Sequence, residues 1–171
     1  DKADGEQALR ALNGILVYRR TKAEPAIAEE LPDRIDELDH CAMTPEQIGL
    51  YQAVVDGLVV DAAETDAGSP QRKGAVLAAI TALKQICNHP SQFLQDSSAF
   101  TRERSHKLER LGEMLEEVMA EGDSVLIFSQ FTEVGSQLER LLKQGLGYNT
   151  YYLHGGTSRG RREAMIEAFQ D

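Results

Sequence analysis

The chain has 171 residues, of which 42% are hydrophobic, and its formal net charge is −10. This length suits one medium-sized domain with a buried core. The acidic balance argues against a broad surface for nucleic acid, because phosphate contacts need clustered cations, but it leaves room for local basic clusters. No apolar run is long enough to cross a membrane and no secretory signal pattern occurs, so we expect a cytoplasmic protein, or a nuclear one in a eukaryote.

The two cysteines, Cys41 and Cys87, lie far apart in the chain and in no spacing typical of a metal site. We therefore expect two free thiols in a reducing compartment. The histidines and carboxylates form no cluster that would bind an ion, so the sequence predicts no metal ligands.

Residues 1–34 are predicted to form a linker segment with short helices. A buried run, Ile15-Leu16-Val17-Tyr18, is followed at once by the cations Arg19, Arg20 and Lys22. Such an abrupt change is typical of a segment that leaves a core and passes along a charged groove or interface. Two interpretations of these cations stay open: a salt-bridge cluster at an interface, and direct contact with DNA or phosphate.

Residues 35–104 are predicted to hold a connecting strand, over 34–43, and a helical insertion. The first helix of the helical insertion begins with a capping box, in which Thr44 caps the helix and Gln47 completes the box. We expect this helix to run to Ala63 and a second helix to cover 75–87. The two should pack as a hairpin, because an amphipathic helix cannot bury its apolar face alone.

The second helix of this hairpin has an apolar stripe that we expect to be buried. Lys84 lies close to the stripe and is predicted to extend its ammonium group to water. The residues of the stripe are Val76, Leu77, Ile80, Leu83 and Cys87.

Residues 105–171 read as helix, strand, helix, strand, helix. Ser105 can cap a helix over 106–121, and two short apolar runs, 125–128 and 151–153, alternate with amphipathic patterns. Continuous apolar runs flanked by such helices are typical of parallel strands buried on both faces. The sequence therefore predicts an α/β fold with parallel strands, joined to the α-helical hairpin.

Polar residues follow both predicted strands, where ligands bind in open α/β sheets. Ser129, Gln130 and Thr157 are neutral donors suited to phosphate oxygens, and Thr157 is predicted to cap the last helix, whose free N–H groups favour an anion. Arg159, Arg161 and Arg162 add positive charge to the same turn. The alternatives are plain strand termination, a turn role for His154, and a solvated helix face for the arginines.

Several stretches occur in one order along the chain. They are Arg19-Arg20-Thr21-Lys22, Glu30-Leu31-Pro32, LKQICNHP over 83–90, Ser105-His106-Lys107-Leu108, LIFSQF over 126–131, and His154-Gly155-Gly156-Thr157. This order closely resembles the C-terminal half of the Swi/Snf-related DNA-dependent ATPases of helicase superfamily two, from about Ile15 to Asp171. That family is a motor of two RecA-like lobes that close over ATP while gripping duplex DNA.

The resemblance implies roles for the segments of this chain. Residues 105–171 resemble the start of a second RecA-like lobe, truncated, and the helices over 45–87 resemble the family's helical insertion. The family's contacts with the nucleic-acid backbone would fall on Ser129, Gln130, His154, Gly155, Thr157 and Arg162. Arg19, Arg20 and Lys22 would lie between the lobes.

Two motifs that the family needs for catalysis do not occur. The sequence has no GxxxxGK[ST] loop for phosphates and no DExH-type acidic motif for magnesium. The resemblance therefore implies that ATP and Mg²⁺ bind to the intact protein, an ATP hydrolase, and that this chain carries no catalytic residue and is inactive alone.

We expect the chain to be a fragment of such a motor, because a sheet of two or three strands is marginal. Its expected partners are double-stranded DNA, the missing first lobe, and a second copy that pairs with an exposed sheet edge. The alternative is a non-catalytic protein-interaction module that retains the helicase-lobe fold. Steep salt dependence of DNA binding would distinguish the motor from this module.

Overall fold

The computed structural model describes residues 6, 35–66 and 68–170. The chain divides into two compact units, Asp1–Asp39 and His40–Asp171, and the contacts reported below all lie within the second. The predicted linker over 1–34, with Arg19, Arg20 and Lys22, falls outside the described residues apart from Glu6. Within the described ranges, no helix is both long and apolar enough to cross a bilayer.

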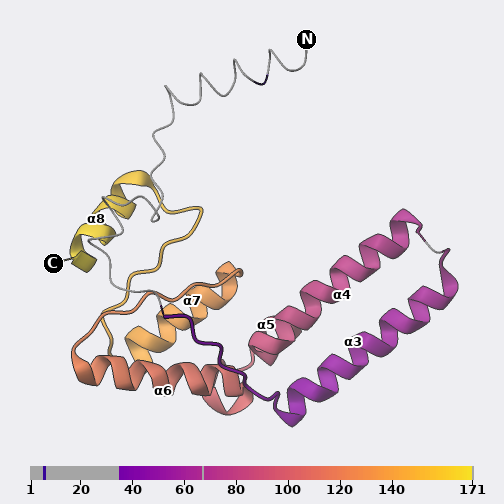
Figure 1. The fold of residues 1–171 in the computed structure, drawn as a ribbon, viewed down its shortest axis with the longest axis horizontal. Helices are drawn as coiled ribbons and strands as arrows, with labels where there is room; N and C mark the ends of the chain where they lie inside the picture. The colour runs from indigo at the N-terminus through magenta and orange to yellow at the C-terminus, as the bar shows by residue number, and fades with distance from the viewer. Residues whose placement is uncertain (1–5, 7–34, 67, 171) are drawn as a thin grey trace. The chain divides into compact units, whose positions relative to one another are not determined.

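The described part of the second unit is helical (Figure 1). Its elements are α3 (Pro45–Glu64), α4 (Pro70–Asn88), α5 (Pro90–Leu94), the 3-10 helix η1 (Arg102–Arg104), α6 (His106–Glu121), α7 (Thr132–Arg140), the π-helical turn η2 (Leu141–Gly145) and α8 (Arg159–Gln170). Helices α3 and α4 form the predicted hairpin, and α6 has the predicted bounds. Helix α4 begins earlier than predicted because the side chain of Ser69 caps it.

The predicted capping box at the start of α3 is confirmed, and it also joins the two helices of the hairpin. Thr44 Oγ1 accepts a hydrogen bond from the N–H of Gln47, and Gln47 Oε1 accepts one from the N–H of Thr44. The nitrogen of the same side-chain amide, Gln47 Nε2, donates to the carbonyl oxygen of Ile86 at 2.7 Å. Gln47 is only 2% exposed, so one side chain satisfies backbone groups of both α3 and α4 away from water.

The end of α4 is the most tightly buried place in the described chain. His89 and Ile86 are fully buried, and the His89 ring lies 4.4 Å from the Phe100 ring, centre to centre. Ser105 Oγ donates to the carbonyl oxygen of Asn88 at 2.7 Å and accepts the N–H of Leu108, so it joins the end of α4 to the cap of α6. The segment CNHP is therefore the structural joint between the hairpin and α6.

Both nitrogens of the buried His89 ring have partners. Nδ1 accepts a hydrogen bond from the N–H of Ser91, and by this bond His89 caps the short helix α5. Nε2 lies 3.0 Å from the carbonyl oxygen of Thr101. A carbonyl can only accept, so Nε2 carries the proton and the ring is neutral. Burial is the main reason that the pKa of His89 lies below its usual value. Helix α5 was not predicted, because histidine is not among the usual capping residues.

The prediction of parallel strands is wrong for the part of the chain that the structure describes. Neither 125–128 nor 151–153 forms a strand there, and the segment 35–43 is also irregular. Leu126 is 67% exposed and Phe128 is 89% exposed, so the first run is not covered on two faces. An apolar run is compatible with a strand, but a strand forms only where a neighbouring backbone completes its hydrogen bonds. Without a sheet among these residues, the predicted sheet edge for self-association is not supported.

The buried face of α4 also differs from the prediction. Ala79 and Ile86 are buried, whereas Val76, Leu77 and Ile80 are 37%, 66% and 46% exposed. Helical periodicity identifies neighbouring faces of one helix, but it does not decide which of them meets α3.

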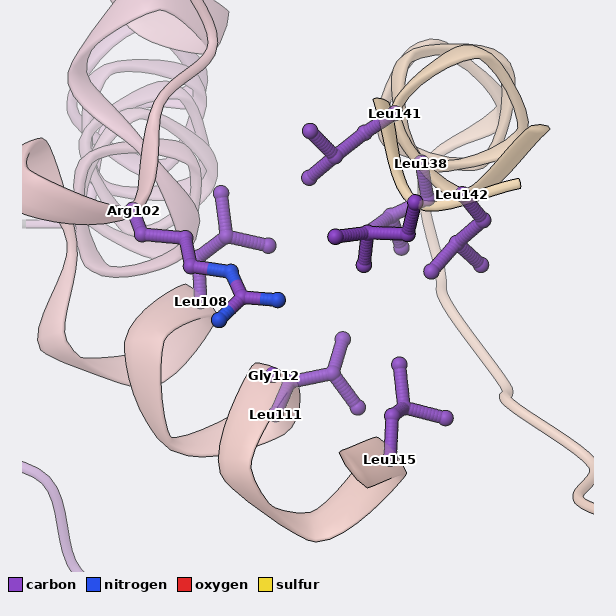
Figure 2. Close-up of a pocket in the computed structure, with 9 residues that line it drawn as sticks. Arg102, Leu108, Leu111, Gly112, Leu115, Leu138, Leu141 and Leu142 are labelled. Atoms are coloured by element: carbon purple, nitrogen blue, oxygen red, sulfur yellow. The ribbon is translucent and has the colours of Figure 1, made fainter. Parts of the chain in front are cut away.

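A small apolar core joins α6 to α7. Leu108, Val134 and Leu138 form its buried centre. Figure 2 shows Arg102 and the leucines of α6, α7 and η2 around a gap. The gap measures about 10 Å³, the lower limit for one water molecule, so it is a packing defect and not a ligand pocket.

Candidate nucleic-acid interface

Ser129 and Gln130 lie immediately before α7, and both are exposed. Ser129 Oγ accepts the N–H of Phe131 at 3.2 Å, which gives the chain a local turn into the helix. Gln130 Oε1 accepts a hydrogen bond from Lys84 Nζ at 3.4 Å. The Gln130 amide NH₂ group has no partner among the described residues, so it is available to an acceptor from outside the chain.

The segment from His154 to Thr157 is a compact turn that holds itself together. Thr157 Oγ1 accepts the N–H of His154 at 3.1 Å, and His154 Nδ1 accepts the N–H of Gly156 at 3.1 Å. The guanidinium group of Arg162 donates to the carbonyl oxygen of His154 at 3.4 Å. Three predicted site residues, His154, Thr157 and Arg162, are thus brought together, and Gly155 lies exposed between the first two.

The predicted capping role of Thr157 is wrong. Helix α8 begins at Arg159, and its first helical hydrogen bond runs from the N–H of Arg162 to the carbonyl oxygen of Ser158. Thr157 therefore lies before the cap position, and its hydroxyl closes the turn.

The three arginines of α8 differ in what they contact. Arg159 is paired with Glu163 at 2.8 Å, four residues further along the helix, and is 91% exposed. This exposed pair matches the interpretation of Arg159 as part of a solvated helix face. Such a pair stabilises a helix by only a few tenths of a kcal/mol. Arg162 contacts a neutral carbonyl and keeps its charge unneutralised. Arg161 is exposed and has no ion pair within the part of the chain described here.

Tyr152 places the His154 turn beside the Gln130 segment. Its hydroxyl donates to the carbonyl oxygen of Thr132 at 2.7 Å, and its ring lies directly over Gly135. A Cβ atom on Gly135 would be 2.6 Å from Tyr152 Cζ, so only glycine permits this approach. The rings of Tyr152 and His154 are 5.0 Å apart, centre to centre. Two segments that are far apart in the sequence therefore meet at the start of α7.

Sequence reasoning missed two residues of this arrangement. Tyr152 was assigned to a strand, and Lys84 was expected only to reach water, whereas both contact the segment around the start of α7. The pattern of apolar and polar residues along the chain does not predict these two contacts, because they join residues that only the tertiary structure brings together.

No metal site accompanies this interface. Within the described ranges, no group of three histidine, cysteine or carboxylate side chains could hold an ion. The donors gathered here are hydroxyl, amide, guanidinium and ammonium groups, a set that suits phosphate oxygens on a nucleic-acid backbone.

Comparison with known proteins decides the family. The SNF2-related domain matches residues 1–92, more than half of the chain. The chain belongs to the SNF2-related family. The helicase conserved C-terminal domain matches residues 106–171, so the resemblance to a Swi/Snf-type helicase of superfamily two, in its C-terminal lobe, is confirmed.

Relatives of this SNF2-related chain include bacterial and eukaryotic proteins. It is 34% identical to the putative ATP-dependent helicase/translocase YwqA of Bacillus subtilis over 90% of this chain and 17% of the relative. It is 30% identical to the nuclear protein STH1/NPS1 of Saccharomyces cerevisiae over 94% of this chain and 13% of that protein. The chain therefore spans less than a fifth of the length of these relatives.

Two solved structures from Sulfolobus solfataricus resemble the SNF2-related chain. The SWI2/SNF2 ATPase core in complex with dsDNA is 33% identical, with a TM-score of 0.76 over 96% of this chain and 34% of that one. The SWI2/SNF2 ATPase C-terminal domain is 33% identical, with a TM-score of 0.71 over 77% of this chain and 56% of that one.

Proposed function

We propose that this chain is part of an ATP-dependent DNA translocase of the SNF2 type and contacts the backbone of duplex DNA. The contact residues are Ser129, Gln130, His154, Gly155, Thr157 and Arg162. Membership of the family supports the motor, and the relative solved with dsDNA supports duplex DNA as the ligand.

One observation carries the assignment to this surface. The hydrogen bond from Tyr152 to Thr132 brings the Gln130 segment and the His154 turn together, and their donors lie at the surface. Arg162 adds a charge that no carboxylate neutralises in the described chain. Neutral donors together with an unpaired cation suit the oxygens of a phosphate backbone. Such contacts bind DNA without reading its bases.

The proposal extends to the parts of the intact protein. Residues 105–171 belong to the C-terminal helicase lobe, residues 35–104 to a connecting segment and helical insertion, and residues 1–34 to a linker between lobes. In this proposal Arg19, Arg20 and Lys22 belong to the junction between the lobes. ATP and Mg²⁺ bind in the whole protein, where positioning and charge neutralisation drive phosphoryl transfer, and this chain by itself is inactive.

The test compares two variants of the full-length protein that contains this chain. Arg162→Ala should lower DNA-stimulated ATP hydrolysis at limiting DNA and lower the affinity for duplex DNA, because a phosphate contact is lost. The control is the double variant Arg159→Ala/Glu163→Ala, which removes an ion pair on the same helix and leaves the net charge unchanged.

Arg162→Ala with unaltered DNA affinity and unaltered salt dependence would refute the assignment of this surface. A full-length protein that neither binds duplex DNA nor hydrolyses ATP in its presence would instead favour a protein-interaction module.

A further inference from the structure

We infer that Lys84 and Lys107 extend the DNA-backbone interface onto the end of α4, so that the helical hairpin contributes phosphate contacts of its own. This inference rests on the proposed function. It assigns two residues that lie outside the Ser129–Gln130 segment and the His154 turn, one on the hairpin and one on α6.

The first observation is the contact of Lys84 with Gln130. Lys84 Nζ donates to Gln130 Oε1 at 3.4 Å across 46 positions of sequence, and both side chains are exposed. The ammonium group therefore lies at the edge of the proposed interface, next to a residue already assigned to it.

The second observation is the position of Lys107. Its Nζ atom lies 3.3 Å from Oδ1 of Asn88, the last residue of α4. Lys84 and Asn88 are four residues apart on that helix, so they lie on one face, slightly more than one turn or about 6 Å apart along its axis. Lys84 and the amide partner of Lys107 therefore stand on neighbouring turns of the same face of α4.

The third observation is what these lysines bind. Each donates to a neutral amide oxygen, which leaves the positive charge unneutralised. Several other cations of the second unit are paired with carboxylates, among them Arg102 with Glu116, Arg104 with Glu46, and Lys143 with Glu139. In a chain of net charge −10, two cations without acidic partners in the described part, both joined to the end of α4, form a local basic site.

Duplex DNA suits this arrangement. One DNA strand carries a phosphate about every 3.4 Å of helix axis, so two cations anchored on neighbouring turns of one helix face can reach phosphates of the same strand. An amide partner positions each ammonium group without competing with a phosphate for its charge, because hydrogen bonds between charged partners are about twice as strong as neutral ones.

The test is the salt dependence of DNA binding by the full-length protein, measured by fluorescence anisotropy with a labelled duplex. Each phosphate contact contributes about 0.9 to the slope of log affinity against log salt. The double variant Lys84→Gln/Lys107→Gln should therefore lower the magnitude of the slope by about 1.8. Between 50 and 200 mM salt, wild-type affinity would then fall about 12-fold further than that of the variant.

Two further variants separate charge from folding and from local geometry. Lys73→Gln removes an exposed lysine at the other end of α4 and should leave the slope unchanged. The double variant Lys84→Arg/Lys107→Arg keeps both charges and should keep the wild-type slope. Loss of slope in the arginine variant, or the same loss in Lys73→Gln, would overturn the inference.

The outcomes also distinguish the inference from the proposed function. Suppose that the wild-type protein binds duplex DNA with a steep slope of log affinity against log salt, and that Lys84→Gln/Lys107→Gln has the same slope. This result overturns the inference and leaves the proposed function standing. Wild-type protein that does not bind duplex DNA overturns the proposed function, and the inference with it.

Discussion

The hydroxyl of Tyr152 donates a 2.7 Å hydrogen bond to the carbonyl oxygen of Thr132. This bond, with the ring lying over Gly135, holds the His154 turn against the start of α7. The site we propose for DNA therefore depends on one aromatic side chain and on a helix that has no side chain where the ring lies.

Gly135→Ala should weaken both the fold and the site. The added methyl group would overlap the Tyr152 ring, and relieving that overlap costs about 1–3 kcal/mol in core-like packing. Thermal or urea unfolding should show the loss of stability, and DNA affinity of the full-length protein should fall because the turn moves. Gly57→Ala is the control, since Gly57 lies in α3 with open space around it and its replacement should stabilise the helix by about 0.5–1 kcal/mol. Equal effects of the two substitutions would show that the Tyr152 contact is not important.

Gln47→Ala should strongly destabilise the second unit. The substitution removes half of the capping box and leaves the buried carbonyl of Ile86 without its donor, which together cost about 2–4 kcal/mol. Urea unfolding followed by circular dichroism would measure the change. Gln52→Ala on the same helix is the matched control, because Gln52 is exposed and donates only to Asp56. Its effect should stay within about 0.5 kcal/mol. A similarly small effect of Gln47→Ala would contradict the double role of this side chain.

Acidification should destabilise the joint at the end of α4 through His89. Burial lowers the pKa of His89, a hydrogen bond to Thr101 opposes this, and the charge of Arg104 lowers the pKa further. Since the folded pKa lies below the usual value near 6.5, the unfolded chain takes up the proton more readily. The stabilising contribution is therefore fully present above about pH 6.5 and is lost as the pH falls through the folded pKa.

The free energy of unfolding between pH 7.5 and 5.5 measures this effect. His89→Gln should lower stability at both pH values and reduce the pH dependence between them. Glu46 does not interfere in this window. Its hydrogen bond with Arg104 lowers the pKa of its carboxyl, so its contribution is lost only at more acid pH, as the pH falls through that lowered pKa. An unchanged pH dependence in His89→Gln would rule out this histidine as the source.

The helices of the hairpin and α6 were predictable because their signals are local. Thr44 and Ser105 cap their helices through the N–H groups three residues further on, and Gly122 ends α6 with a φ of 80°, which favours glycine. In each case the deciding residues lie within one turn of the helix end, so sequence spacing is enough.

The predictions that failed concern contacts between distant parts of the chain. The run over 125–128 has the composition of a buried strand, yet Phe128 is 89% exposed, because composition cannot supply a partner strand. Likewise, the stripe with Leu77 and Ile80 is apolar, but α4 turns the face with Ala79 and Ile86 inward. The choice between two neighbouring faces is made by α3 and not by α4 itself.

The sequence by itself determined the family, the helix boundaries set by caps, and the residue types of the candidate site. Only the tertiary structure decided that Tyr152 lies over Gly135, that Lys84 reaches Gln130, and that the His154 turn is closed by Thr157. The physical reason is range. Caps and turns are formed by groups a few residues apart, whereas the first two of these contacts depend on which surfaces meet when the whole core packs.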